Sequence, residues 1–179
     1  MSSEALPKLL SDKRALTVIN AVLFQCAWFV FILAKPVFVG ITLGIFLFVH
    51  YWLFNPSKKE WAVIVFVGVW GALVDSMLIA ADLLPLEPMY IFSFTTAPFW
   101  LVSLWLAFAM TLHHSLRFLQ SNIVLAAALA AIAAPWAYYV GGFLRGVVIP
   151  WSGLVAIAIV WACWLPLATR FIAKAESER

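Results

Sequence analysis

The chain has 179 residues, of which 66% are hydrophobic and 11% are charged, with a formal net charge of +3. Soluble domains average roughly 45–50% apolar and about 25% charged residues, so this composition excludes a soluble globular protein. Because the apolar residues come in uninterrupted runs of membrane-spanning length, we expect an integral membrane protein.

Six apolar runs predict a bundle of six transmembrane helices with short loops, forming one membrane domain over residues 1–179. Each run has about 19–23 residues, close to the roughly 20 that a helix needs to cross ~30 Å of hydrocarbon. The runs lack the two-residue alternation of a membrane β-strand, so the predicted fold class is all-α. In chain order, the expected spans are residues 15–33, 36–54, 61–80, 98–116, 122–140 and 147–169.

The basic residues predict how the spans are oriented. Only Lys35 and Arg145 fall on one side of the expected membrane. The other nine fall on the opposite side: Lys8, Lys13, Arg14, Lys58, Lys59, Arg117, Arg170, Lys174 and Arg179. Basic loops remain in the cytoplasm, so we expect both termini there and the protein in the bacterial inner membrane. The basic pI follows from this threading and does not indicate nucleic-acid binding.

Asp75 lies inside the third run, about 14 residues past Trp61, which places it in the outer half of the bilayer. A carboxylate in hydrocarbon costs several kcal/mol unless it is protonated, paired or facing a wet cavity. Gly68, Gly71 and Asp75 share one helical face, so Asp75 is expected to face a neighbouring helix. Two interpretations stay open: Asp75 is a catalytic or proton-transferring residue, or it is a hydrogen-bonded joint between helices.

Several polar and aromatic residues fall near the depth of Asp75 and predict a pocket around it. Tyr138 and Tyr139 are at the outer end of the fifth run, and Trp100 is at the outer start of the fourth. The candidate substrate-binding residues are Gln25, Trp100, Tyr138, Tyr139 and Arg145.

Asn20 and Gln25 both lie in the first run, five residues apart, and therefore face different sides of the helix. At least one of them is expected to hydrogen-bond a neighbouring helix. The alternative for Gln25 is a place in the Asp75 pocket.

Gly40 and Gly44 form a small-xxx-small pattern in the second run, which lets two helix backbones approach closely. This pattern fits either a homodimer interface or, as we expect, a contact inside the bundle.

His50, His113 and His114 approach the cytoplasmic ends of the second and fourth runs. Their similar depth permits a shared metal or a bis-histidine haem, but no haem-attachment motif or paired carboxylate accompanies them. We therefore expect interfacial histidines, with no metal and no cofactor. Nucleophile-elbow, zinc-protease, P-loop and dinucleotide motifs are missing as well, so the sequence identifies no reaction.

Most of the chain resembles a family of small bacterial inner-membrane proteins known only as domain of unknown function 2878. The resembling residues include Asn20 with Gln25 and Trp28, then 71–75 (GALVD), 98–100 (PFW) and 135–141 (PWAYYVG). Genes of that family often neighbour lipid-modifying and oxidative-stress enzymes. The resemblance therefore implies a role in envelope lipids, with lipid-modifying enzymes as partners, and it transfers no catalytic residues.

A second, partial resemblance is to the small membrane carotenoid (lycopene) cyclases. Asp75, the segment 84–88 (LPLEP) and Phe92 look like the Asp and acidic Pro-x-Glu loop of those enzymes, although Pro88 stands where they carry a second acid. The resemblance implies an acid that protonates a polyene beside aromatic rings.

Together these observations favour a protein of lipid or isoprenoid metabolism, or an accessory subunit to it, whose Asp75 pocket receives an apolar ligand from membrane lipid. Two alternatives stay open: a small proton-coupled transporter that uses Asp75, and a non-catalytic assembly partner.

Overall fold

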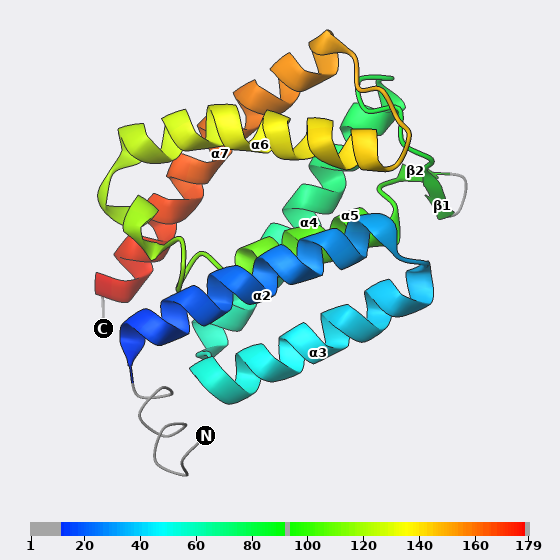
Figure 1. Ribbon diagram of the computed structural model, residues 1–179. Coiled ribbons are helices and arrows are strands. Elements are labelled where there is room, and N and C mark those ends of the chain that lie inside the picture. Colours follow the sequence, from blue (N-terminus) through cyan, green and yellow to red (C-terminus); the bar gives the residue numbers. More distant parts are fainter. Residues whose placement is uncertain (1–11, 92–93, 178–179) are drawn as a thin grey trace.

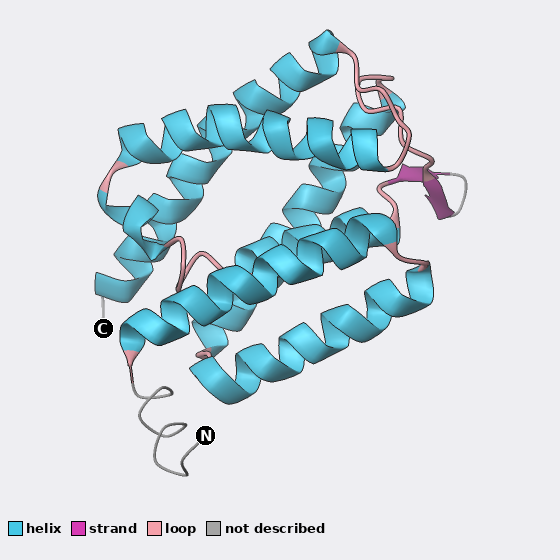
Figure 2. Ribbon diagram, in the orientation of Figure 1, coloured by secondary structure: helices cyan, strands magenta, loops and turns pink. Residues whose placement is uncertain are grey.

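The computed structural model describes residues 12–91 and 94–177 (Figure 1). Lys8, Phe92 and Arg179 therefore lie outside the described residues. The regular elements of the described chain are helices apart from one short β-hairpin, and loops and turns join them (Figure 2). Its elements are α2 (Lys13–Leu33), α3 (Pro36–Phe54), α4 (Lys58–Ala80), β1 (Met89–Ile91), β2 (Phe94–Thr96), α5 (Phe99–Ala109), η1 (Arg117–Ser121), α6 (Ile123–Leu144) and α7 (Trp151–Ser177).

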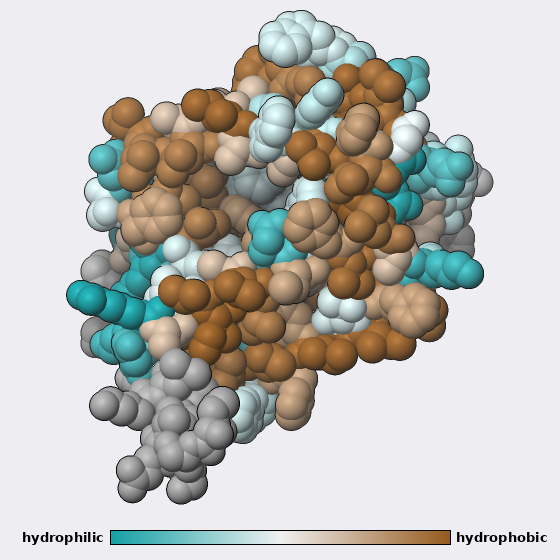
Figure 3. Space-filling model, viewed as in Figure 1, coloured by the Kyte–Doolittle hydropathy of each residue, from teal (hydrophilic) through white to brown (hydrophobic). Residues whose placement is uncertain are grey.

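Within residues 12–91 and 94–177, five helices are long and apolar enough to cross a membrane: α2, α3, α4, α6 and α7. Their outward faces keep large hydrophobic side chains exposed, such as Phe48, Ile132 and Phe171. On the face shown in Figure 3, these apolar surfaces form a band, with hydrophilic side chains gathered at its two ends. Apolar surface on this scale needs lipid around it, which confirms the prediction of a multi-pass membrane protein.

Side chains that accept hydrogen bonds cap the beginnings of three of the long helices, α2, α4 and α6. Asp12 accepts a hydrogen bond from the Arg14 backbone N–H at the start of α2. Ser57 serves the Glu60 N–H in the same way at α4, and Asn122 begins α6. These are the residue types that satisfy the free N–H groups of a first helical turn.

The fourth predicted span differs from the structure. The helix expected over residues 98–116 ends at Ala109, so α5 has 11 residues and is only ~16 Å long. Turns follow it, and then the 3-10 helix η1. A helix of this length does not cross the hydrocarbon by itself, and the count of six spans stays a prediction.

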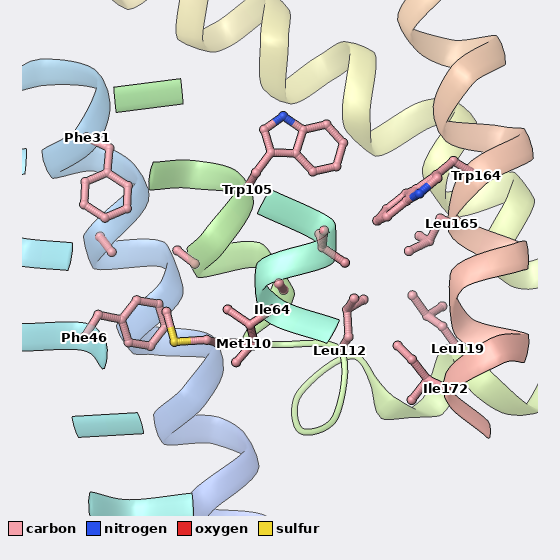
Figure 4. Packing of buried hydrophobic residues seen from close by; sticks show 14 of the residues in the cluster. Phe31, Phe46, Ile64, Trp105, Met110, Leu112, Leu119, Trp164, Leu165 and Ile172 are labelled. Atoms are coloured by element: carbon pink, nitrogen blue, oxygen red, sulfur yellow. The ribbon is translucent and has the colours of Figure 1, made fainter. Parts of the chain in front are cut away.

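α5 packs against three of the long helices, α2, α3 and α4. Met110 and Leu112, in the turns that follow α5, are completely buried. Met110 shares one apolar cluster with Phe46 of α3 and Ile64 of α4 (Figure 4). Irregular backbone at membrane depth is tolerated where protein surrounds it, and this segment meets that condition.

Asn20 of α2 satisfies the backbone where α5 ends. Its side-chain amide donates to the Met110 carbonyl at 3.1 Å. Its carbonyl oxygen accepts from the Ser115 hydroxyl at 2.6 Å and from the Ser115 backbone N–H at 3.3 Å. Gln120 adds a bond from its side-chain amide to the Leu112 carbonyl at 3.1 Å. The prediction that Asn20 or Gln25 bonds a neighbouring segment is thus confirmed for Asn20.

The connection between the third and fourth predicted spans contains the β1–β2 hairpin, which the sequence did not predict. The strands pair antiparallel, with Met89 opposite Thr96. The backbone N–H of Ala97, just after β2, donates to the Ser76 hydroxyl of α4 at 2.8 Å. The hairpin therefore joins the end of α4 to the start of α5.

We expect Asn20→Leu to destabilise the protein, because Met110 and Ser115 lose buried hydrogen bonds that lipid cannot replace. Each buried group left without a partner costs about 1–3 kcal/mol. The thermal midpoint of the purified protein in detergent measures the effect. Gln25→Leu, on the same helix, is the matched control and should leave the midpoint nearly unchanged; equal losses in the two variants would contradict this role of Asn20.

Candidate functional site

Asp75 lies on the inner face of α4 with its side chain fully buried. Two glycines on the same face let α5 approach. A Cβ atom at Gly71 would overlap the indole ring of Trp105, and one at Gly68 would overlap the side chain of Leu106. This placement agrees with the expectation that Asp75 faces a neighbouring helix rather than lipid.

Each carboxylate oxygen of Asp75 accepts one hydrogen bond. The indole N–H of Trp105 donates to Oδ2 at 2.6 Å, and the hydroxyl of Tyr138 donates to Oδ1 at 2.7 Å. Asp75 therefore connects α4 to both α5 and α6. These bonds fit the interpretation of Asp75 as a hydrogen-bonded joint between helices. They also hold the Tyr138 hydroxyl in a fixed position.

Aromatic rings from α7 fix the position of Trp105. The ring of Trp161 stacks on it, with centroids 4.5 Å apart and planes 16° apart. Trp164 meets it edge-on at 5.4 Å. Trp161 and Trp164 are three residues apart and so share one face of α7. The three-residue spacing of Trp161 and Trp164 could have indicated an aromatic face on α7, but it was not among the predictions.

A cavity of about 530 Å³ lies beside this group, lined by residues of α2, α5, α6 and α7. Trp105 and Tyr138 contribute to its wall, whereas Asp75 is not among the described residues that line it. The two aromatic side chains therefore stand between the carboxylate and the cavity. In Figure 3 the surface between α6 and α2 is hollowed, with apolar side chains on both sides.

Three of the five predicted substrate-binding residues line the cavity: Gln25, Trp100 and Tyr138. Tyr139 does not; it is exposed, and its ring lies 5.8 Å from that of Trp136. Gln25 thus lines the same cavity as Tyr138, and its place in a pocket with Asp75 stays a prediction.

Arg145 lies outside the cavity wall but contacts it. Its guanidinium lies 4.4 Å above the centre of the Trp100 ring, within reach of a cation–π attraction. Nη1 also donates to the Ile32 carbonyl at 2.5 Å, which fastens the end of α6 to the end of α2. The binding roles of all five residues stay predictions.

The two glycines predicted as a packing motif differ in their surroundings. A Cβ at Gly40 would lie 3.9 Å from the Phe99 ring of α5, in ordinary contact. A Cβ at Gly44 would meet nothing within 4 Å. A contact inside the bundle is therefore seen at Gly40, and the homodimer interface through Gly40 and Gly44 stays a prediction.

A second polar cluster contains two of the predicted histidines. The Nε2 atoms of His50 and His114 lie 3.1 Å and 2.9 Å from Oε1 of Glu60. The expectation that no carboxylate accompanies the histidines is therefore wrong. Glu60 falls between the predicted spans 36–54 and 61–80, where the sequence indicated a loop. In the structure it lies in the first turn of α4, close to His50 near the end of α3.

We expect Asp75→Leu to destabilise the protein strongly, because the Trp105 N–H and the Tyr138 O–H would both be buried without an acceptor, at about 1–3 kcal/mol each. Asp75→Asn should cost much less. Its carbonyl oxygen can accept from Trp105, while its amide donates to the oxygen of Tyr138. Thermal midpoints in detergent compare the two variants, and equal losses would show that more than hydrogen bonding depends on the carboxylate.

Searches of curated proteins and of solved structures find no match to this chain. The resemblance to carotenoid cyclases therefore gains no support. The sequence model of one family, described as Protein of unknown function (DUF2878), matches residues 17–167. This match covers most of the chain and includes Asn20, Asp75 and Tyr138. The chain therefore belongs to the DUF2878 family of proteins of unknown function.

Proposed function

We propose that this protein binds the apolar part of a membrane lipid or isoprenoid, and acts in envelope lipid or isoprenoid metabolism or as an accessory subunit to its enzymes. In this proposal it resides in the bacterial inner membrane with both termini in the cytoplasm, and α5 with the turns after it completes a sixth crossing. The single observation that carries the proposal is the apolar cavity whose wall includes the hydrogen-bonded Tyr138.

The size and chemistry of the cavity support an apolar ligand. Its volume of about 530 Å³ is within the range of roughly 300–1,000 Å³ typical of small-molecule sites. Such sites are mostly apolar, with a few polar groups that orient the ligand. Here Trp28, Trp100 and Trp161 supply apolar wall, and Gln25 and Tyr138 supply polar groups.

Asp75 acts through Tyr138 in this proposal. Because the Tyr138 hydroxyl donates its proton to Asp75, its oxygen is left as an acceptor for a hydroxyl or head-group donor of the ligand. Trp105 and Trp161 present aromatic faces that bind hydrocarbon chains and attract cations. Asp75 is thus a positioning residue for Tyr138.

The proton-coupled transporter remains the alternative function. A carrier needs a polar path to both faces of the membrane, whereas the described residues around the cavity are chiefly apolar. A purely structural assembly partner needs no cavity beside Tyr138. The presence of the cavity and its apolar wall therefore favour the lipid-binding function over these two alternatives.

Filling the cavity should displace the ligand. Ala133 of α6 lines the cavity, and Ala133→Phe should reduce the lipid that copurifies with the protein severalfold, because the new ring occupies the ligand's volume. Ala128→Phe, at an exposed position of the same helix outside the cavity wall, is the control. Mass spectrometry of lipids extracted from the two purified variants measures the difference. Equal lipid content in both would count against a cavity-bound lipid.

The Asp75→Asn variant separates lipid binding from proton transport in cells. Deletion of the gene should change the envelope lipid profile, and the Asp75→Asn variant should restore most of it. The amide still holds Tyr138 in place, and the Tyr138 O–H is then offered to a ligand hydroxyl, which can accept as well as donate. A transporter that depends on protonation of Asp75 would be inactive, because the amide does not titrate. An unchanged lipid profile in the deletion strain would contradict the proposed role in lipid metabolism.

A further inference from the structure

His50, Glu60 and His114 meet at the end of the bundle that carries most of the described basic residues. Glu60 Oε1 lies between the two imidazoles, and all three potential ligand atoms lie within 4.8 Å of one another. We propose that these three side chains form a binding site for a divalent transition-metal ion of the zinc type. The proposal does not depend on the lipid cavity, whose wall these residues do not share.

The distances between the side chains are close to those a metal requires. Zinc binds imidazole nitrogen and carboxylate oxygen at roughly 2.0–2.2 Å, so tetrahedral ligand atoms lie about 3.3–3.5 Å apart. The hydrogen-bonded distances of 3.1 Å and 2.9 Å are shorter by only a few tenths of an ångström. Small side-chain rotations would therefore open the cluster enough to admit the ion.

The donor set selects the type of metal. Two imidazoles and one carboxylate suit zinc and its first-row neighbours, whereas magnesium and calcium prefer oxygen ligands. Two histidines and one glutamate also occur at catalytic zinc sites, where the fourth position stays open for water or substrate. The expected site accordingly has three protein ligands and one open position.

Burial and ring contacts hold the Nε2 atoms of both histidines beside Glu60. His50 is fully buried, Glu60 is 8% exposed, and His114 is half-buried. The Nδ1 atom of His50 has no hydrogen-bond partner among the described residues, so Nε2 makes the ring's polar contact. Phe54 packs against the His114 ring at 4.1 Å, and Trp61 meets His50 edge-on at 5.9 Å. These rings restrict both imidazoles.

Three separate segments hold the ligands in place before any ion binds. His50 is in the last turn of α3, and Glu60 is in the first turn of α4, where its N–H bonds to Ser57 at 3.2 Å. His114 precedes Ser115, which Asn20 holds by two hydrogen bonds. Rigid support of this kind lowers the ordering cost of binding.

The test uses full-length protein in detergent, stripped with a chelator and then equilibrated with Zn²⁺. We expect one bound zinc per chain by elemental analysis after dialysis. Glu60→Gln and His114→Gln should each weaken binding about tenfold or more. His113→Gln is the matched control, because His113 is the neighbour in sequence but not a member of the cluster, and it should bind as the parent does. Unchanged binding in Glu60→Gln and His114→Gln, or none in the parent, would overturn the proposal.

A gain-of-signal variant keeps the proposal testable if those variants fold poorly. His114→Cys replaces one ligand with a thiolate, which also coordinates these metals. With Co²⁺ as the probe, His114→Cys should show a thiolate-to-cobalt charge-transfer band that neither the parent nor His113→Cys shows. An identical absorption spectrum for the two cysteine variants would show that the metal does not bind at His114.

Discussion

Hydrocarbon offers no hydrogen bonds, and the central segment of this protein is organised around that constraint. α5 stops after 11 residues at membrane depth, where its last carbonyls would be costly without partners. The side chain of Asn20 supplies bonds to Met110 and Ser115, and Gln120 supplies another to Leu112. The break is thus stable inside the bundle, and it positions both Trp105 before it and His114 after it.

Two polar groups of the described interior, those around Asp75 and Glu60, each include a side chain of this segment. Trp105 of α5 reaches Asp75 of α4 because Gly71 on α4 leaves room for its ring. His114, in the turns beyond α5, reaches Glu60 at the other end of α4. Each acid of α4 therefore has one partner from the segment formed by α5 and the turns after it. α5 also lines the cavity, together with α2, α6 and α7.

Hydropathy predicted the five long helices because each of them is a continuous apolar run long enough to cross a membrane. It failed for residues 98–116, since an apolar sequence enclosed by protein reads the same as one enclosed by lipid. Helical spacing correctly predicted that Asp75 shares the inner face of its helix with Gly68 and Gly71. Three of the predicted binding residues, Gln25, Trp100 and Tyr138, line one cavity. Glu60 was missed because a charged residue next to Lys58 and Lys59 looks like part of a loop; its pairing with His50 and His114 depends on tertiary packing.

The order of Asn20 and Met110 along the chain has a consequence for biogenesis. A helix as short as α5 is a weak signal for the insertion machinery, yet α2, with its amide already in place, emerges from the ribosome about 90 residues earlier. The nascent chain thus carries the capping group into the bilayer ahead of the break that needs it. We expect α2 to assist assembly of the later segment, because Asn20 offers hydrogen bonds to backbone that lipid leaves unpaired.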